Sequence, residues 1–552
     1  MNVVISMINS KYIHSSLAPW YLLAGVREFC DAKIKAKVIE GTINENYKKI
    51  SDRLSAENTD IYAFCCYIWN IDYVKKIAEE IKNKTGAKIV FGGPEVSYNA
   101  DEILLENEFV DFVLSGEGEE SFASLCSCLA ENKDISAVKG LCYRENGKII
   151  IAEPVVSDKE PVSPYCEEYF TALNGRIAYI EASRGCPFSC AFCLSGRCGK
   201  LILFDIDRVK KEILLLANSR TQTVKFIDRT FNAKPERANE IISFIIDNYG
   251  KEIPSNVCFH FEIDGGTLKE STLELLKKAP TGLFQLEVGL QSFNSETLRA
   301  VHRNPDTTKL EQTINELIAS GNMHIHADLI AGLPYENIDS FRNSFNRLYE
   351  LKPHMLQLGF LKLLHGSELR EKSDDFNCIY HSHAPYEVVS TDCLSEDDMQ
   401  TIHFAEDAVD RLYNSGRFRR TLDFLVDECN ILPFDLFESF GEFTADKKNI
   451  PLDEYIGLVY NFFGSKTDET KLRDKLVCDR IASNPSGIIP DCLKIPDNRL
   501  KRIKKHLSEN MKLGGKTACA ILYSENKVVY CDYKYKNPVT ENYELSFMEI
   551  IL

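Results

Sequence analysis

The sequence lacks long hydrophobic runs and is short of positive charge. No stretch approaches the roughly 18 uninterrupted apolar residues of a transmembrane helix, and the start, MNVVISMINSKYIHSS, has no basic segment followed by a long apolar one, as a signal peptide would. The 65 Lys and Arg against 82 Asp and Glu give a formal net charge of -17. Because neutralising a phosphate backbone needs a basic face, we expect no nucleic acid partner. The missing apolar runs predict no membrane association, and the expected substrate is a small molecule.

A disulfide framework is also missing. The 19 cysteines are scattered along 552 residues, and their odd number would leave at least one unpaired. This favours a reducing cytoplasm, and an anaerobic setting suits the chemistry inferred below. The length predicts two or three domains.

The first 135 residues alternate short β-rich runs with helical patterns. The pattern predicts an α/β domain with a doubly wound, Rossmann-like parallel sheet, whose ligands lie beyond the carboxyl ends of the strands. The expected strands lie at 2–6, 36–40, 61–67, 87–93 and 111–116. Residues 136–176 then predict a hairpin with a turn at Asn146 and Gly147, followed by a proline-containing linker.

Longer strand and helix units follow in residues 177–374. They predict a partial (β/α)6 barrel with its functional residues at the strand C-termini. The six expected strands are 177–183, 223–228, 257–263, 283–290, 324–332 and 354–364. Residues 375–552 predict a mainly helical C-terminal domain that ends in a hairpin and could shape a substrate pocket.

Three cysteines, Cys186, Cys190 and Cys193, form a CxxxCxxC loop directly after the first barrel strand. Three thiolates on a [4Fe-4S] cluster leave one iron open. S-adenosylmethionine (SAM) can chelate that iron and be cleaved reductively to a 5′-deoxyadenosyl radical. The alternative is a structural zinc knuckle, for which Cys198 could supply the fourth ligand.

With these cysteines, the chain resembles the radical SAM superfamily, in the branch with an N-terminal cobalamin-binding-type domain. The matching segments are GCPFSCAFC, TVKFIDRTF, HFEID, EVGLQSFNSETL, DLIAGLP and LKLLHGSEL, in the family's order. The resemblance assigns the cluster to the three cysteines and implies SAM contacts for Phe192, Asp228, Glu262, Glu287, Gln291 and Asp328. Each carboxylate among them could instead line the barrel and cap a neighbouring backbone group.

The segment from residue 89 to residue 122 resembles the cobalamin-binding-type domain itself. The sequence has no Asp-x-His-x-x-Gly motif, and His14 is the only histidine in the first 259 residues. A structural role is favoured for His14 over cobalt ligation. The resemblance therefore leaves two possibilities open, a domain that binds cobalamin without a protein histidine and an empty scaffold that closes over the barrel.

The sequence is compatible with three functions. The first is a cobalamin-dependent radical SAM methyltransferase, and the second a cobalamin-independent radical rearrangement, cyclisation or carbon–carbon lyase. Both need a reductant such as flavodoxin or ferredoxin. The third is a non-catalytic Fe–S or zinc sensor, which would have no use for the barrel motifs. In the C-terminal domain, residues 384–394 resemble an uncharacterised domain of this branch, and Cys378, His381 and His383 are favoured as ordinary loop residues over a metal site.

Overall fold

The computed structural model describes residues 1–30, 33–197, 200–510 and 516–550. Cys198 lies outside the described residues. The chain forms two compact units: unit 1 comprises Met1–Lys278, Arg299–Arg303 and Leu361–Asp392, and unit 2 comprises Ala279–Leu298, Asn304–Phe360 and Cys393–Leu552. Because a compact unit groups contacting segments and can divide a domain, the domain limits expected from the sequence stay a prediction.

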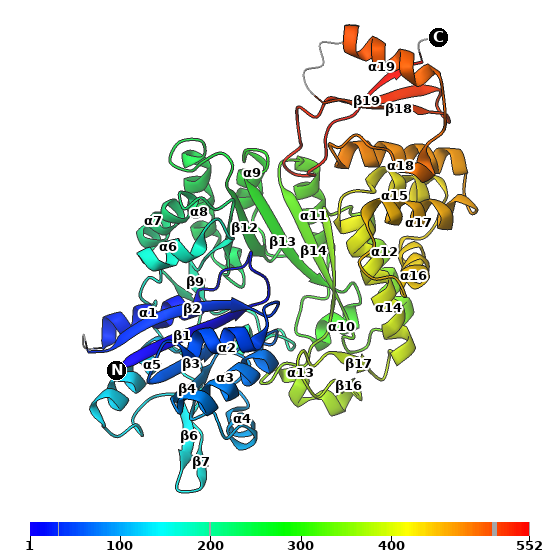
Figure 1. Ribbon diagram of the computed structural model, residues 1–552. Coiled ribbons are helices and arrows are strands. Elements are labelled where there is room, and N and C mark those ends of the chain that lie inside the picture. Colours follow the sequence, from blue (N-terminus) through cyan, green and yellow to red (C-terminus); the bar gives the residue numbers. More distant parts are fainter. Residues whose placement is uncertain (31–32, 198–199, 511–515, 551–552) are drawn as a thin grey trace. The chain divides into compact units, whose positions relative to one another are not determined.

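Unit 1 begins with a seven-stranded sheet of order β2-β1-β3-β4-β5-β6-β7 (Figure 1). Strands β1 to β5 are parallel, and β6 and β7 add an antiparallel hairpin. All five expected strands are present, and the hairpin turns at Asn146 and Gly147, which both have positive φ. The strands are β1 (Asn2–Asn9), β2 (Lys35–Thr42), β3 (Ile61–Cys65), β4 (Lys88–Gly92), β5 (Phe112–Leu114), β6 (Leu141–Glu145) and β7 (Lys148–Ile150).

Helices cover both faces of this sheet, which is why β1 and β3 are buried along almost their whole length. Helices α2, α3 and α4 bury side chains in one core, while α1 and α5 pack against each other. Their bounds are α1 (Ala18–Phe29), α2 (Tyr47–Ser55), α3 (Ile71–Thr85), α4 (Ala100–Glu106) and α5 (Glu119–Glu131), and α6 (Glu167–Leu173) follows in the linker.

The order 2-1-3-4-5 places the reversal of strand order between β1 and β3, where open α/β sheets bind ligands at the carboxyl ends of the strands. Unit 1 continues with three of the expected barrel strands, which run parallel in the order β12-β11-β8. These strands and their helices are β8 (Ala178–Ile180), β11 (Thr223–Phe226), β12 (Cys258–Ile263), α7 (Ile206–Ala217), α8 (Pro235–Asn248) and α9 (Glu270–Lys277); the short strands β9 (Ser183–Arg184) and β10 (Ile202–Leu203) pair antiparallel.

Unit 2 holds the other three barrel strands, parallel in the order β15-β14-β13. They and the helices near them are β13 (Phe284–Gln291), β14 (His324–Ala331), β15 (Met355–Phe360), α10 (Ser295–Ala300), α11 (Thr308–Ser320) and α12 (Ile338–Glu350). The sixth strand ends at Phe360, earlier than the expected residue 364. The chain changes partners there: the Leu363 N–H donates to the Tyr386 carbonyl, and the Val388 N–H donates to the Leu361 carbonyl.

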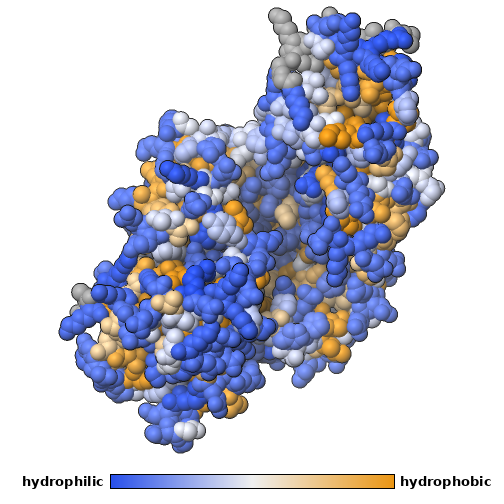
Figure 2. All heavy atoms as spheres, in the orientation of Figure 1, coloured by the Kyte–Doolittle hydropathy of each residue, from blue (hydrophilic) through white to orange (hydrophobic). Residues whose placement is uncertain are grey.

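The remaining segment is mainly helical and ends in a small sheet, as expected, except that β20 adds a third strand to the predicted hairpin of β18 and β19. Its elements are α13 (Glu368–Glu371), β16 (Ile379–Tyr380), β17 (Val388–Ser390), α14 (Glu396–Ala408), α15 (Arg419–Asp423), α16 (Pro433–Thr444), α17 (Leu452–Gly464), α18 (Glu469–Ser483), α19 (Arg499–Asn510), β18 (Ala518–Leu522), β19 (Lys527–Cys531) and β20 (Ser546–Glu549). Hydrophilic side chains cover most of the face shown in Figure 2. Among the described residues, no helix is long and apolar enough to cross a membrane.

Gly116, after β5, combines a φ of 86° with very close packing. A Cβ there would lie 2.2 Å from the backbone N and O of Val155. We expect Gly116→Ala to lower the free energy of unfolding by about 2–5 kcal/mol, from backbone strain and steric overlap together. Thermal unfolding of the purified variant measures the loss.

The matched control is Gly147→Ala in the hairpin turn, where φ is 76° but no atom lies within 4 Å of the added Cβ. This change should cost only about 1 kcal/mol, from the left-handed backbone alone. Equal losses in the two variants would contradict the role of the Val155 contact.

Candidate functional site

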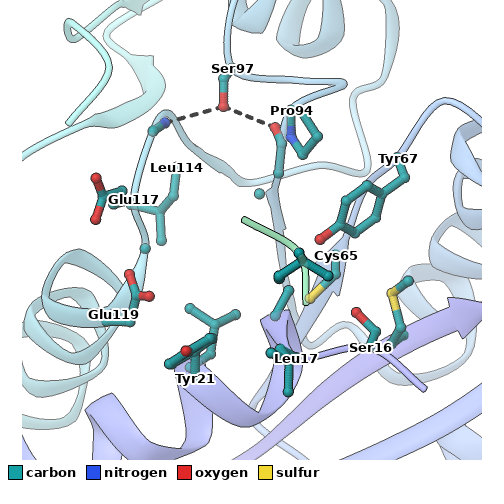
Figure 3. Close-up of a pocket in the computed structure, with 18 of the residues that line it drawn as sticks. Ser16, Leu17, Tyr21, Cys65, Tyr67, Pro94, Ser97, Leu114, Glu117 and Glu119 are labelled. Carbon is teal, nitrogen blue, oxygen red and sulfur yellow. Dashed lines mark hydrogen bonds between the residues drawn. The ribbon is translucent and has the colours of Figure 1, made fainter. Parts of the chain in front are cut away.

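A cavity of about 700 Å³ lies inside unit 1 (Figure 3). It is lined by the loops that follow β1, β3, β4 and β5, by the first turns of α1 and α5, and by residues at the ends of β8, β11 and β12. Such a volume is ordinary for a cofactor pocket. The carboxyl ends of two groups of parallel strands therefore open onto one cavity.

The loops after β4 and β5 approach the cavity with their backbone. Gly93 has a φ of 116°, and a Cβ there would lie 2.4 Å from the Cys66 carbonyl oxygen, so only glycine fits. The Ser97 hydroxyl donates to the Gly93 carbonyl (2.9 Å) and accepts from the Gly116 N–H (3.1 Å), as Figure 3 shows. This hydroxyl ties the two glycine loops together.

The wall near β1, β3 and α1 is mostly apolar, with Leu17 and Tyr21 drawn in Figure 3. Burial raises the pKa of the Cys65 thiol to about 12, so this thiol is neutral at physiological pH. His14 also lines the cavity, and its Nδ1 lies 2.7 Å from the Tyr179 hydroxyl oxygen. Burial, helped by the charges of Lys11 and Lys225, lowers the His14 pKa and favours a neutral imidazole.

The three loop cysteines follow β9 directly and are all partly exposed. Burial is the main cause of the raised pKa of Cys190, which the Arg303 charge opposes and the nearby Cys193 and Cys186 thiols reinforce. The Cys193 N–H donates to the Cys190 carbonyl (3.0 Å), and Cys186 Sγ lies 3.5 Å from the Thr230 hydroxyl oxygen. Three partly exposed thiols on one short loop suit a multi-iron group.

Two later segments of unit 1 brace this loop. The Ala191 N–H donates to the Val301 carbonyl (3.3 Å), and the Leu369 N–H donates to the Ala191 carbonyl (3.0 Å). The Arg303 guanidinium donates to Cys190 Sγ at 3.6 Å. Sequence reasoning missed Val301 and Arg303 because they lie more than 100 positions from the cysteines, and it gave Leu369 no role beside the cysteine loop.

Among the described residues, no three His, Cys, Asp or Glu side chains lie close enough together to hold a single metal ion. This covers Cys378, His381 and His383, where the two imidazole rings are 5.7 Å apart. Burial raises the pKa of Cys378 to about 11. The expectation that these three are ordinary loop residues stays a prediction.

Three of the residues implied to contact SAM lie in unit 1. Phe192 is half-buried within the cysteine loop, and Glu262 lines the cavity with a carboxylate oxygen 3.5 Å from Lys225 Nζ. Asp228 is buried. It accepts from the Ala182 N–H (2.9 Å) and the Ser183 hydroxyl (2.5 Å), and burial raises its pKa to about 7. Its contacts fix the chain just before the cysteine loop.

The other three lie in unit 2, on neighbouring strands. Glu287 and Asp328 stand on β13 and β14, where Asp328 pairs in register with Gly289. Gln291 ends β13 at a register shift, with a φ of 76°. Its side-chain carbonyl oxygen is buried without a hydrogen-bond partner among the described residues.

Glu336, just beyond the GLP turn, is a further residue that the sequence did not single out. It is fully buried and accepts from the hydroxyls of Ser292 (2.6 Å) and Ser344 (3.0 Å), while its other carboxyl oxygen has no partner among the described residues. Ser344 in turn accepts from the Phe293 N–H (3.1 Å). The carboxyl thereby anchors the turn that follows Gln291.

Comparison with known families matches residues 3–126 to the B12 binding domain, residues 180–348 to the radical SAM superfamily, and residues 374–527 to a family described as a protein of unknown function (DUF4080). The chain thus carries a B12-binding domain, a radical SAM domain and a DUF4080 region, in that order along the sequence.

Individual relatives agree with this assignment. The 2-(S-pantetheinyl)-carbapenam-3-carboxylate methyltransferase of Streptantibioticus cattleyicolor is 28% identical over 316 residues, which cover 53% of this chain. The match spans 45% of that relative, less than half of its length. Among solved structures, the cobalamin-dependent SAM radical enzyme OxsB matches 92% of this chain and 81% of its own, with a TM-score of 0.61 and 13% identity.

The radical SAM methyltransferase TsrM from Kitasatospora setae, solved with cobalamin and a [4Fe-4S] cluster, matches 70% of this chain and 76% of its own, with a TM-score of 0.57 and 16% identity. At these identities the two structures establish the fold. They confirm the expected fold class, an N-terminal doubly wound sheet, a partial barrel and a mainly helical C-terminal region.

The buried Glu336 generates a pH-dependence prediction. Burial raises its pKa from 4.5 to about 7. The folded state therefore binds a proton between these values that the unfolded state has lost, and this stabilisation disappears as the pH rises through 7. We expect the wild-type protein to lose on the order of 2 kcal/mol of stability between pH 5 and pH 8 from this group.

Glu336→Gln keeps the shape of the neutral acid and should flatten this part of the profile, as measured by thermal unfolding across the pH range. The control is Glu350→Gln, at an exposed position at the end of α12, the helix that follows Glu336. Its stability profile should match that of the wild type. Parallel profiles for wild type and Glu336→Gln would show that the carboxyl does not titrate in this range.

Proposed function

We propose that this protein is a radical SAM enzyme that binds a [4Fe-4S] cluster, SAM and cobalamin, and that it methylates a small-molecule substrate. The observation that carries the proposal is the single cavity onto which the B12-binding domain and the first radical SAM strands both open. A cavity of this kind suits a reaction in which two cofactors serve one substrate. The named methyltransferases among the relatives support the same reaction class.

When bound, the cluster supplies the electron that cleaves SAM to a 5′-deoxyadenosyl radical, and cobalamin supplies a transferable methyl group. Cys186, Cys190 and Cys193 would hold the cluster. Their loop lies beyond the carboxyl end of the parallel strand β8 and follows the short strand β9, and barrel folds place functional residues at such strand ends. The donation from Arg303 to Cys190 Sγ stabilises negative charge on that sulfur.

On the B12-binding side, the chain's own residues would bind and orient. Gly93 and Gly116 let the backbone approach a ligand, and Ser97 keeps their two loops at a fixed separation. Leu17 and Tyr21 exclude water from the wall beneath. His14 shares its Nδ1 with Tyr179, which fixes the orientation of the imidazole at the cavity edge.

Phe192, Asp228, Glu262, Glu287, Gln291 and Asp328 are proposed to position SAM. For Glu262 the support is its place in the cavity wall, and for Gln291 it is the buried, unpartnered carbonyl oxygen among the described residues. Asp228 would act through Ala182 and Ser183, since both of its oxygens already accept from them.

The proposal extends to the surroundings of the enzyme. A low-potential reductant such as flavodoxin or ferredoxin would reduce the cluster. No disulfide joins the described cysteines, which suits a reducing cytoplasm. The DUF4080 region would shape the substrate pocket.

The first test is the triple variant Cys186→Ala, Cys190→Ala, Cys193→Ala. After anaerobic reconstitution, the wild type should hold about four irons per chain and cleave SAM to 5′-deoxyadenosine on reduction. The variant should lose both the iron and the cleavage. Cys378→Ala, a cysteine outside the loop, should behave as the wild type. SAM cleavage by the triple variant would refute the proposed cluster site.

The second test concerns the cavity. Ala18 lines it, so Ala18→Phe should weaken binding of hydroxocobalamin by about tenfold or more, as a large side chain enters the pocket. Absorption titration measures the affinity. Ala130→Phe, at an exposed position of α5, is the matched control and should bind as the wild type.

Failure of the wild type to bind hydroxocobalamin at all, with SAM cleavage intact, would favour the second reaction class. That class is a cobalamin-independent rearrangement, cyclisation or carbon–carbon cleavage. A reconstituted wild-type protein that holds iron without cleaving SAM would favour the third function, a non-catalytic Fe–S sensor.

A further inference from the structure

Arg184 lies two residues before the first loop cysteine and contacts three carboxylates at the cavity wall. Its Nε and Nη2 donate to the two oxygens of Glu181 at 3.0 and 2.9 Å. Its Nη1 donates to Glu117 at 2.7 Å and to Glu119 at 2.9 Å. The guanidinium also lies 5.2 Å from the centre of the Tyr21 ring. The arginine therefore uses all three of its nitrogens.

These partners come from both parts of the cavity. Glu117 and Glu119 belong to the loop after β5 and the first turn of α5, in the B12-binding domain. Glu181 follows β8, the first radical SAM strand. The arginine thus joins the loop after β5, the last parallel strand of the first sheet, to the segment that carries the loop cysteines.

The backbone around Arg184 is held as firmly as the side chain. Arg184 pairs with Ile202 in the β9–β10 ladder. The next residue, Gly185, has a φ of 90°, and a Cβ there would lie 2.7 Å from the Lys200 carbonyl oxygen. Because the backbone on both sides is held closely, a displacement of Arg184 is passed along the chain to Cys186.

The network has a marked imbalance of charge. One guanidinium faces three carboxylates, and the exposed fractions of the four side chains are 17% for Arg184, 21% for Glu117, 14% for Glu119 and 11% for Glu181. Burial raises the pKa of Glu117, which the Arg184 charge opposes. Removing the arginine would leave three carboxylates close together with little water, and they would separate.

We infer that Arg184 is a positioning residue that couples the two cofactor sites, since it anchors the cluster loop to the glycine loop that lines the B12-binding side of the cavity. A ligand that shifts the loop of Glu117 and Glu119 would then also shift Cys186. This inference rests on the proposed function. The side-chain hydrogen bonds of the arginine run to Glu117, Glu119 and Glu181, so its proposed effect on the cysteine loop is on geometry.

The experiment compares Arg184→Met with Arg184→Lys in anaerobically reconstituted full-length protein. The readouts are iron content, the affinity for hydroxocobalamin by absorption titration, and the electron paramagnetic resonance spectrum of the reduced cluster with SAM. We expect Arg184→Met to retain its iron, to bind hydroxocobalamin about 10- to 100-fold more weakly, and to show altered g-values with SAM. Arg184→Lys keeps the positive charge but loses the forked guanidinium. Its affinity for hydroxocobalamin and its g-values should lie between those of the wild type and those of Arg184→Met.

The matched control is Arg27→Met, which removes an exposed ion pair with Glu168 in the same unit. If Arg184→Met matches Arg27→Met in both affinity and spectrum, the inference is wrong. If Arg184→Met does not fold, Glu119→Gln decides, because it removes one of the three negative charges that face the arginine and weakens that ion pair. Unchanged affinity and spectrum in that variant overturn the inference, and changes in both support it.

Failure of the proposed function is distinguishable from failure of this inference. A wild-type protein without iron, or without a spectral response to SAM, refutes the proposed function. A wild type that responds to SAM but does not bind hydroxocobalamin refutes the cobalamin part of the proposed function, and the coupling between two cofactor sites is then wrong as well.

Discussion

Parallel strand pairing is the constraint on which the site depends. Because all strands of a parallel sheet point the same way, their exit loops gather at one edge, and unit 1 contains two such groups whose exit loops line one cavity. Gly93 and Gly116 bring backbone to one side of it, and the chain from Glu181 to the loop cysteines starts at the other side. The rest of unit 1 keeps these loops at a fixed separation.

The loops are held by polar contacts that join distant parts of the chain. Ser97 links two glycine loops, Arg184 links three carboxylates, and Ala191 is bonded on both sides by later segments. In unit 2, Glu336 does the same for the turn after Gln291. Such buried contacts stabilise the site only when every donor and acceptor is in place, so each of them favours one arrangement of the loops that it joins.

The sequence predicted the elements well wherever local periodicity decides them. The five parallel strands, the Asn146–Gly147 turn and the barrel strands follow from alternation and turn chemistry. It missed the early end of the sixth strand and the third strand of the terminal sheet. Both depend on pairing with a segment elsewhere in the chain, at Tyr386 for the first and β19 for the second, which no local pattern encodes.

The sequence by itself determined the chemistry that is available: three thiolates at CxxxCxxC spacing on a loop after a strand, an ordered set of barrel motifs, and a doubly wound domain in front. The spacing of a motif is a local property, so it can be determined from the sequence alone. Only the tertiary structure decided which residues surround that loop, because Arg303 and Glu117 meet the cysteine segment through folding across 60 to 120 positions of chain. Burial and charge, which set the protonation of Asp228 and Glu336, arise from the same long-range packing.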